Sequence, residues 1–172
     1  MNRIFINLFF VLFIGLKGCG IYSFTGASIP SGASTFQVNF FENQAGSRPG
    51  STVEPGLDRD FTLALQDIIL GQTNLNLVNS DGDLVYEGEI TQYSITPMTS
   101  TAKLTAAQNR LTMNVNLRYF NTKNEEDDFE SQFSFFYDFP AEKQLYDIQG
   151  PAHDEIFERI TQDIFNATLA KW

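Results

Sequence analysis

The sequence contains few of the residues that enzymes use for chemistry. It has one cysteine, Cys19, and one histidine, His153, in 172 residues. A catalytic triad or a zinc site needs histidine, cysteine or both in larger numbers. His153 lies in the first turn of a helix predicted below, where we expect a structural role. We therefore expect a protein that is not an enzyme and that needs no metal or cofactor.

Basic residues are also scarce. The chain has 11 Lys and Arg against 21 Asp and Glu, which gives a formal net charge of −10. Proteins that bind nucleic acid depend on clustered Lys and Arg to release counterions from phosphate groups. The charge balance therefore excludes nucleic acid as an expected partner.

An apolar run long enough to span a membrane is lacking as well. The longest such run, Ile4–Leu16, follows Arg3 and precedes small residues. As a helix it covers about 20 Å, which is less than the roughly 30 Å hydrocarbon layer of a bilayer. A cation, a short apolar run and small residues in this order are typical of a cleaved signal peptide. We assign residues 1–18 to that signal peptide.

The end of this signal, Leu16–Cys19, resembles a bacterial lipobox, the tetrapeptide after which lipoprotein signal peptidase cuts. The resemblance implies a diacylglyceryl group on the Cys19 sulfur and a third acyl chain on the new amino terminus, which together would hold the protein on a bilayer. Lys17 departs from the small apolar residue that is usual at its position. The alternative is ordinary secretion with a free thiol. An uncapped single thiol is unfavourable in an oxidising compartment, which favours lipidation.

Residues 19–35 are rich in Gly, Ser and Thr and predict an extended, lipidated tether. Tyr22, Phe24 and Ile29 interrupt its polarity. These three residues either dock onto the folded domain or lie at the membrane surface, and we favour docking. Residues 36–172 then form a single domain, and the 17 phenylalanines of the chain supply a packed core.

Hydrophobic periodicity predicts the elements of this domain. Alternating apolar residues predict strands at 36–40, 75–78, 84–95, 111–119 and 129–139, and a 3.6-residue period predicts helices near 57–71 and 151–170. The alternation shifts phase within 84–95, which predicts a bulge near Thr91. The order of elements predicts an α+β fold, with two helices packed on one face of a mostly antiparallel sheet of four to five strands.

The connecting segments are polar. Residues 42–56 and 97–107 are predicted loops, and 121–128 is a predicted hairpin tip. The tip contains the acidic cluster Glu125–Asp128, which lacks the spaced oxygen donors and the turn glycine of a calcium loop. We interpret it as a charged turn.

Segments along most of the mature chain resemble the lipopolysaccharide-assembly outer-membrane lipoproteins. These segments are Cys19–Pro30, Gln72–Leu75, Gly82–Leu84, Gly88–Thr91 and Ala106–Thr112. The resemblance implies two helices on one side of a sheet. It also implies a lipoprotein that plugs the lumen of a large outer-membrane β-barrel, helps that barrel to fold and contacts lipopolysaccharide on its way to the cell surface. The absence of an acidic run after Cys19 implies, by lipoprotein sorting rules, retention on the outer membrane facing the periplasm.

The resemblance also implies particular site residues. Basic residues near one end of the domain contact lipopolysaccharide phosphates in the family, which points to Lys103, Arg110 and Arg118. The polar, uncharged side of strand 111–119 is a candidate surface for the barrel partner. Its residues are Thr112, Asn114 and Asn116. A plain solvated sheet face is the alternative interpretation of these residues.

A second function remains open at this point. The chain could be a free-standing periplasmic lipoprotein that binds an apolar ligand between its helices and its sheet. The aromatic strand 129–139 would line such a pocket. Core packing alone also accounts for these aromatic residues.

Overall fold

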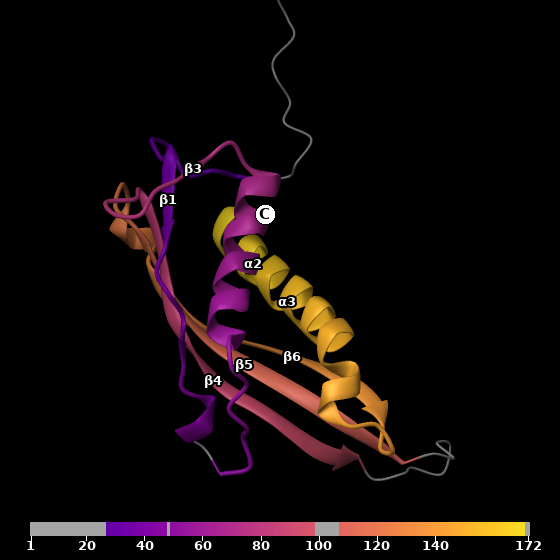
Figure 1. The fold of residues 1–172 in the computed structure, drawn as a ribbon. Coiled ribbons are helices and arrows are strands. Elements are labelled where there is room, and N and C mark those ends of the chain that lie inside the picture. The colour runs from indigo at the N-terminus through magenta and orange to yellow at the C-terminus, as the bar shows by residue number, and fades with distance from the viewer. Residues whose placement is uncertain (1–26, 48, 99–106, 171–172) are drawn as a thin grey trace, which may run out of the picture.

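The computed structural model describes residues 27–47, 49–98 and 107–170. Two helices cover one face of a six-stranded sheet (Figure 1), which agrees with the predicted α+β class. The strands are β1 (Thr35–Val38), β2 (Glu42–Asn43), β3 (Asn76–Leu77), β4 (Leu84–Met98), β5 (Gln108–Asn121) and β6 (Phe129–Pro140), and the helices are α2 (Leu57–Gln72) and α3 (Leu145–Leu169).

The sheet is mixed, so the prediction of a mostly antiparallel sheet of four to five strands was wrong. Its strands follow the order β3-β1-β4-β5-β6, and β2 pairs with β4. The strands β4, β5 and β6 are antiparallel, whereas β1 runs parallel to both β3 and β4, and β2 runs parallel to β4. Helix α2 carries the chain from β1 to β3, and parallel neighbours require a crossover of this kind.

The long strands β4 and β5 meet the sequence prediction closely. Their register shifts between Ile90 and Gln92, which confirms the bulge expected near Thr91. The bulge changes which residues of β4 point towards the helices, from Ile90 before it to Tyr93 after it. Both halves of the strand therefore present apolar side chains to the core.

The core lies between the sheet and the two helices. Rings from the β1–β2 connection, α2 and α3 meet edge to face: Phe41 and Phe61 with centroids 5.2 Å apart, and Phe61 and Phe157 with centroids 5.8 Å apart. On α3, Ile156 and Ile160 lie a turn apart on the buried face. Ile29 of the predicted tether also packs against this core, whereas Tyr22 and Phe24 lie outside the described residues.

Helix α3 begins earlier than predicted, at Leu145 and not at Pro151. A capping box closes its first turn. The side chain of Gln144 accepts a hydrogen bond from the backbone of Asp147, and the side chain of Asp147 accepts one from the backbone of Gln144. Pro151 stands inside the helix near its start, and a proline there ordinarily marks the first turn, which is why the sequence pattern places the start too late.

His153 is consequently in the helix body and not in its first turn. Its Nε2 lies 2.8 Å from the hydroxyl of Tyr93, and its ring stacks on Phe157 with centroids 5.2 Å apart. Burial lowers the pKa of His153 below its ordinary value. The place of His153 in the helix differs from the prediction, and its structural role stays a prediction.

Asp83 joins three parts of the chain at one end of the sheet. Its Oδ2 accepts hydrogen bonds from the backbone of Ser34 (2.9 Å) and Thr35 (3.0 Å), and its Oδ1 lies 2.7 Å from Nζ of Lys123. The ammonium of Lys123 and these donors hold the pKa of the Asp83 carboxyl well below its usual value of 3.8. The start of β1, the start of β4 and the β5–β6 hairpin are thereby fixed together.

A first prediction concerns two glycines in different surroundings. A Cβ at Gly88 would collide with the carbonyl oxygen of Asn116 and lie 2.8 Å from the ring of Phe41, whereas a Cβ at Gly71 would meet nothing within 4 Å. We expect Gly88→Ala to lower the free energy of unfolding by about 3 kcal/mol. Gly71→Ala, the matched control in α2, should raise it by about 0.5–1 kcal/mol. Urea unfolding measures both, and equal effects would contradict the account.

A second prediction concerns acid stability. Because the folded-state pKa of Asp83 is depressed, its ionised form stabilises the fold above the unfolded pKa, and this stabilisation is lost as the pH falls. Asp83→Asn should therefore lower the Tm at pH 7 and reduce the further drop in Tm between about pH 5 and pH 3. Thermal unfolding followed across this range checks it. A variant whose Tm falls in parallel with the wild type would contradict the role of the carboxylate.

Candidate functional site: the outer face of the sheet

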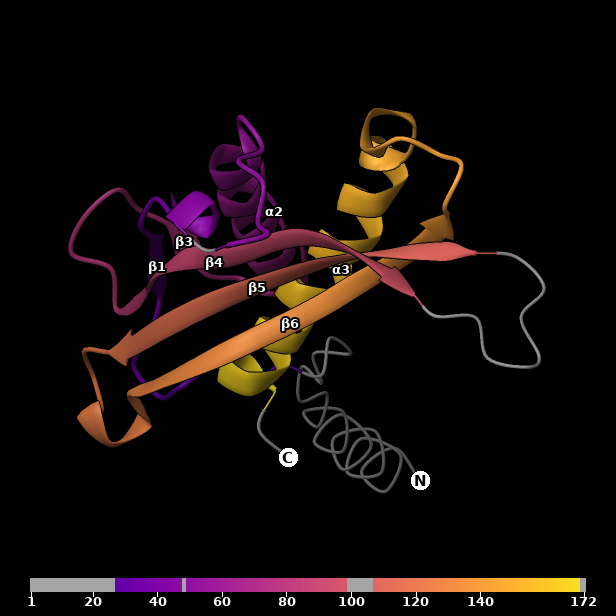
Figure 2. The same cartoon turned by 90° about the horizontal axis from the view of Figure 1, so that it is seen from below.

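The face of the sheet opposite the helices is polar, and in the described part of the chain no helix covers it (Figure 2). We call this surface of β4, β5 and β6 the outer face. Because side chains alternate along a strand, cross-strand partners share it in rows. The rows are Glu87–Arg118–Glu130, Glu89–Asn116–Gln132, Gln92–Asn114–Ser134, Ser94–Thr112–Phe136 and Thr96–Arg110–Asp138.

The middle of the outer face is a ladder of uncharged hydrogen bonds. The Nδ2 of Asn114 donates to Oε1 of Gln92 at 2.9 Å, and the hydroxyl of Ser134 donates to Oδ1 of Asn114 at 2.6 Å. Gln92 in turn donates to the hydroxyl of Ser94 at 2.8 Å. The ladder holds these side chains in one arrangement.

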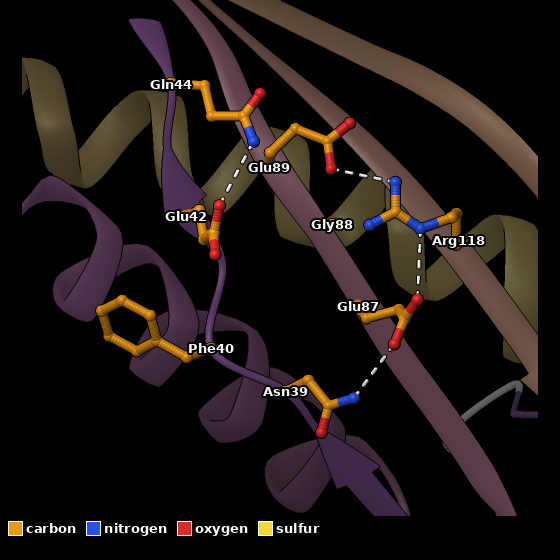
Figure 3. A pocket seen from close by; sticks show the side chains of 8 residues that line it. All are labelled: Asn39, Phe40, Glu42, Gln44, Glu87, Gly88, Glu89 and Arg118. Atoms are coloured by element: carbon orange, nitrogen blue, oxygen red, sulfur yellow. Dashed lines mark hydrogen bonds and ion pairs between the residues drawn. The ribbon is translucent and has the colours of Figure 1, made fainter.

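Arg118 forms a clamp at one end of this ladder (Figure 3). Its Nη1 lies 2.9 Å from Glu89 and its Nε lies 3.2 Å from Glu87. Asn39 donates to the Glu87 carboxylate at 3.1 Å, and Asn116 donates to Glu89 at 3.2 Å. One guanidinium thus lies between two carboxylates, and the local charge is negative.

An open hollow of about 230 Å³ lies beside this clamp. Its lining residues come from the β1–β2 region, β4 and β5, and are Asn39, Phe40, Glu42, Gln44, Glu87, Gly88, Glu89 and Arg118 (Figure 3). The described residues contain no group of three or more His, Cys, Asp or Glu side chains placed to hold a metal ion. The hollow is therefore an acidic, solvent-open surface feature outside the helix–sheet core.

Arg110 occupies the other end of the outer face. It makes a bidentate pair with Asp138, with distances of 2.7 Å and 2.8 Å, and its guanidinium lies 3.5 Å from the centroid of the Phe136 ring. The guanidinium holds the pKa of the Asp138 carboxyl below its usual range. A guanidinium that makes two hydrogen bonds to one carboxylate and stacks on a ring is held in a fixed orientation.

The structure brings most of the sequence-predicted site residues onto one surface. Thr112, Asn114 and Asn116 lie on the outer face of β5, between Arg110 and Arg118. Lys103 and Cys19 lie outside the described residues. Whether Arg110 and Arg118 contact lipopolysaccharide stays a prediction, and both already have carboxylate partners.

Sequence reasoning missed the partners of these residues. Gln92 and Ser94 were not assigned to the outer face, and Phe136 and Asp138 were not linked to Arg110. The phase shift at Thr91 was the available signal, because it determines that Gln92 and not Thr91 lies opposite Asn114.

Fold and face together define a class of protein: an α+β domain with a helix-covered core on one side of its sheet and a bare, hydrogen-bonded polar surface on the other. The sequence identifies the family within this class. The model of the lipopolysaccharide-assembly family, LptE, matches residues 33–168, and the chain belongs to this family. No curated protein sequence matches the chain.

Solved structures with a related arrangement are distant. The hypothetical protein CT253 of Chlamydia trachomatis has a TM-score of 0.48 and 12% identity, over 81% of this chain and 99% of that one. A minor lipoprotein of Acinetobacter baumannii has a TM-score of 0.46 and 12% identity, over 81% and 98%. The rare lipoprotein B of Shewanella oneidensis has a TM-score of 0.43 and 12% identity, over 76% and 89%. These likenesses are too low to carry an argument about function.

Within the described ranges, neither helix is both long and apolar enough to cross a membrane. The exposed side of α3 carries charged residues such as Glu155 and Asp163.

A third prediction tests the Arg118 clamp. Arg118→Gln leaves Glu87 and Glu89 facing each other without a cation, so the free energy of unfolding should fall by about 1 kcal/mol at low salt and by less at high salt. Arg59→Gln is the matched control, because within the described residues Arg59 forms an ion pair only with Asp60 and its side chain is 67% exposed. Urea unfolding at two salt concentrations compares them. If both variants lose the same stability, the clamp does not exist as described.

Proposed function

We propose that this protein is an outer-membrane lipoprotein that acts as plug and scaffold subunit of a β-barrel translocon for lipopolysaccharide. The observation that carries the proposal is the outer face of β4, β5 and β6: a polar surface, held in a fixed arrangement by its own hydrogen bonds, that the described helices leave bare. Membership of the lipopolysaccharide-assembly family supports the same role.

The physical fit is between two polar surfaces. The lumen of a large outer-membrane barrel is polar and wet. A surface with pre-paired amides and hydroxyls can approach such a wall without leaving buried groups unsatisfied, since Asn114, Gln92 and Ser134 already satisfy each other. The apolar core residues stay on the opposite side of the sheet, under the helices, whereas Phe136 and Phe120 are exposed. The protein then contacts the barrel through the sheet and keeps its core intact.

The proposed anchor is the lipidated Cys19, with the domain on the periplasmic side of the outer membrane. Two or three acyl chains hold a protein on a bilayer, whereas one chain binds reversibly. The described chain begins with Ala27 packed near the end of α3, where Ser28 donates a backbone hydrogen bond to Leu169. In this proposal the tether leaves the domain at that end.

Direct contact with lipopolysaccharide is proposed to be local and non-catalytic. The net charge of −10 opposes a broad anion-binding surface. At Arg110 a phosphate must compete with the bidentate Asp138, and at Arg118 it must compete with Glu87 and Glu89. Lys103 is the third candidate in this proposal.

The alternative function, binding of an apolar ligand between helices and sheet, has less support. The side chains in this space, such as Phe61, Tyr86 and Ile160, are fully buried and belong to one core cluster. Core packing therefore accounts for these side chains without a ligand.

A fourth prediction tests the proposed interface in intact cells. A photocrosslinking residue at Asn114 should capture one large outer-membrane barrel protein, identified by mass spectrometry, because the ladder faces the barrel wall. The same residue at Asp163, on the exposed side of α3, is the matched control and should capture it weakly.

The variant Asn114→Arg provides the complementary measurement. It should keep the Tm within a few degrees, because the residue lies on the outer face and not in the core, yet reduce co-purification with the barrel by about 10-fold. Capture of the barrel from Asp163 but not from Asn114, or full co-purification of Asn114→Arg, would contradict the proposal.

A further inference from the structure

Strand β6 forms an uncapped edge of the sheet. It pairs with β5 without a break from Phe129 to Pro140, and no described strand pairs with its other side (Figure 2). Alternate residues of an edge strand point their backbone N–H and C=O groups away from the sheet. Within the described ranges, no backbone hydrogen bond from Phe129–Phe139 leaves in that direction.

This edge lacks the usual protection against pairing. Edge strands are commonly blunted by a bulge, an interior proline or lysines. β6 has an uninterrupted register, its one proline is its last residue, and it contains no lysine. Its length and regularity make it a template for another strand.

The side chains of β6 are incompletely covered in a way that one added strand would correct. On the helix side, Phe133, Phe135 and Tyr137 are only partly buried although they pack against the core. On the outer face, Glu130 is exposed and has no hydrogen bond or ion pair within the described residues, because its cross-strand neighbour Arg118 is held by two other glutamates. Asp138 is already neutralised by Arg110.

A second copy of this chain is a poor occupant. If two β6 strands paired antiparallel about Ser134, Glu130 of each copy would lie opposite Asp138 of the other. The net charge of −10 on each copy adds to this repulsion. The charge on the edge fits a strand that carries a basic residue.

We propose that the free edge of β6 accepts one extended segment of the barrel partner, which lengthens the sheet by one strand. This inference rests on the proposed function. The segment alternates: apolar side chains on the helix side cover Phe133, Phe135 and Tyr137, and polar side chains on the outer face include a Lys or Arg opposite Glu130. Backbone hydrogen bonds along the edge supply affinity, and the alternating side chains supply register.

Residue-resolved amide hydrogen exchange tests this inference, on the free protein and on its complex with the barrel extracted in mild detergent. Alternate amides of β6 should exchange on the order of 100-fold more slowly in the complex, whereas the intervening amides, already bonded to β5, should change little. This alternation is specific to strand pairing, because simple coverage by a barrel wall does not select every second amide.

The outcomes separate the inference from the function that it rests on. If the complex forms and Asn114 crosslinks to the barrel, but β6 amides exchange as in the free protein, the inference is overturned and the proposed function stands. If no barrel complex is recovered, both are overturned.

Proline substitution at two adjacent positions adds an independent test. The backbone N–H groups of Ser131 and Gln132 point to opposite sides of β6, so one of the variants Ser131→Pro and Gln132→Pro loses a bond to β5 and the other loses only the free edge donor. We expect the second to keep its Tm and to lose barrel retention by about 10-fold. Wild-type retention of the thermally stable variant would overturn the inference. If neither variant folds, the exchange experiment decides.

Discussion

The strict alternation of side chains along β4, β5 and β6 is the constraint on which the rest of this structure depends. One set of residues, including Tyr86 and Leu117, packs beneath two helices, and the other set, including Asn114 and Gln92, forms the outer face. A shift of one residue in register would exchange the two sets. The bulge between Ile90 and Gln92 interrupts this alternation once and thereby keeps apolar residues of β4 facing the helices on both sides of it. The absence of a side chain at Gly88 lets Asn116 and Phe41 approach closely.

The outer face is polar, and most of its charged side chains are paired, with Glu130 as an unpaired exception among the described residues. Arg118 lies between Glu87 and Glu89, Arg110 is paired with Asp138, and the amides between them bond to one another. Removing water from groups that are already paired costs less free energy than removing it from unpaired charges. Family membership and this surface therefore support the same proposed role, a subunit that contacts a polar barrel wall.

The hydrophobic periodicity of the sequence was sufficient to predict the helices and the long strands. A shift in the phase of that periodicity predicted the bulge. The mixed sheet was not predictable in this way. Nothing in Phe36–Phe40 specifies whether its neighbour is parallel, and β2, with two residues, is too short to show a period. The early start of α3 depends on the capping pair Gln144 and Asp147 and was obscured by Pro151. The outer-face residues of β5 were predicted because they alternate with apolar residues along the strand. Their partners on β4 could be identified only from the register after the bulge.

The central claim is that the outer face is covered by a partner in the envelope, and thiol labelling measures this directly. The chain has one cysteine, Cys19, so a single added cysteine can be followed by a maleimide reagent. Thr112→Cys places the thiol on the outer face, and Glu155→Cys places it on the exposed side of α3. The account predicts that the thiol at position 112 reacts slowly in native envelopes and rapidly in the purified protein, while the thiol at position 155 reacts rapidly in both. Equally rapid labelling of both positions in the envelope would contradict it.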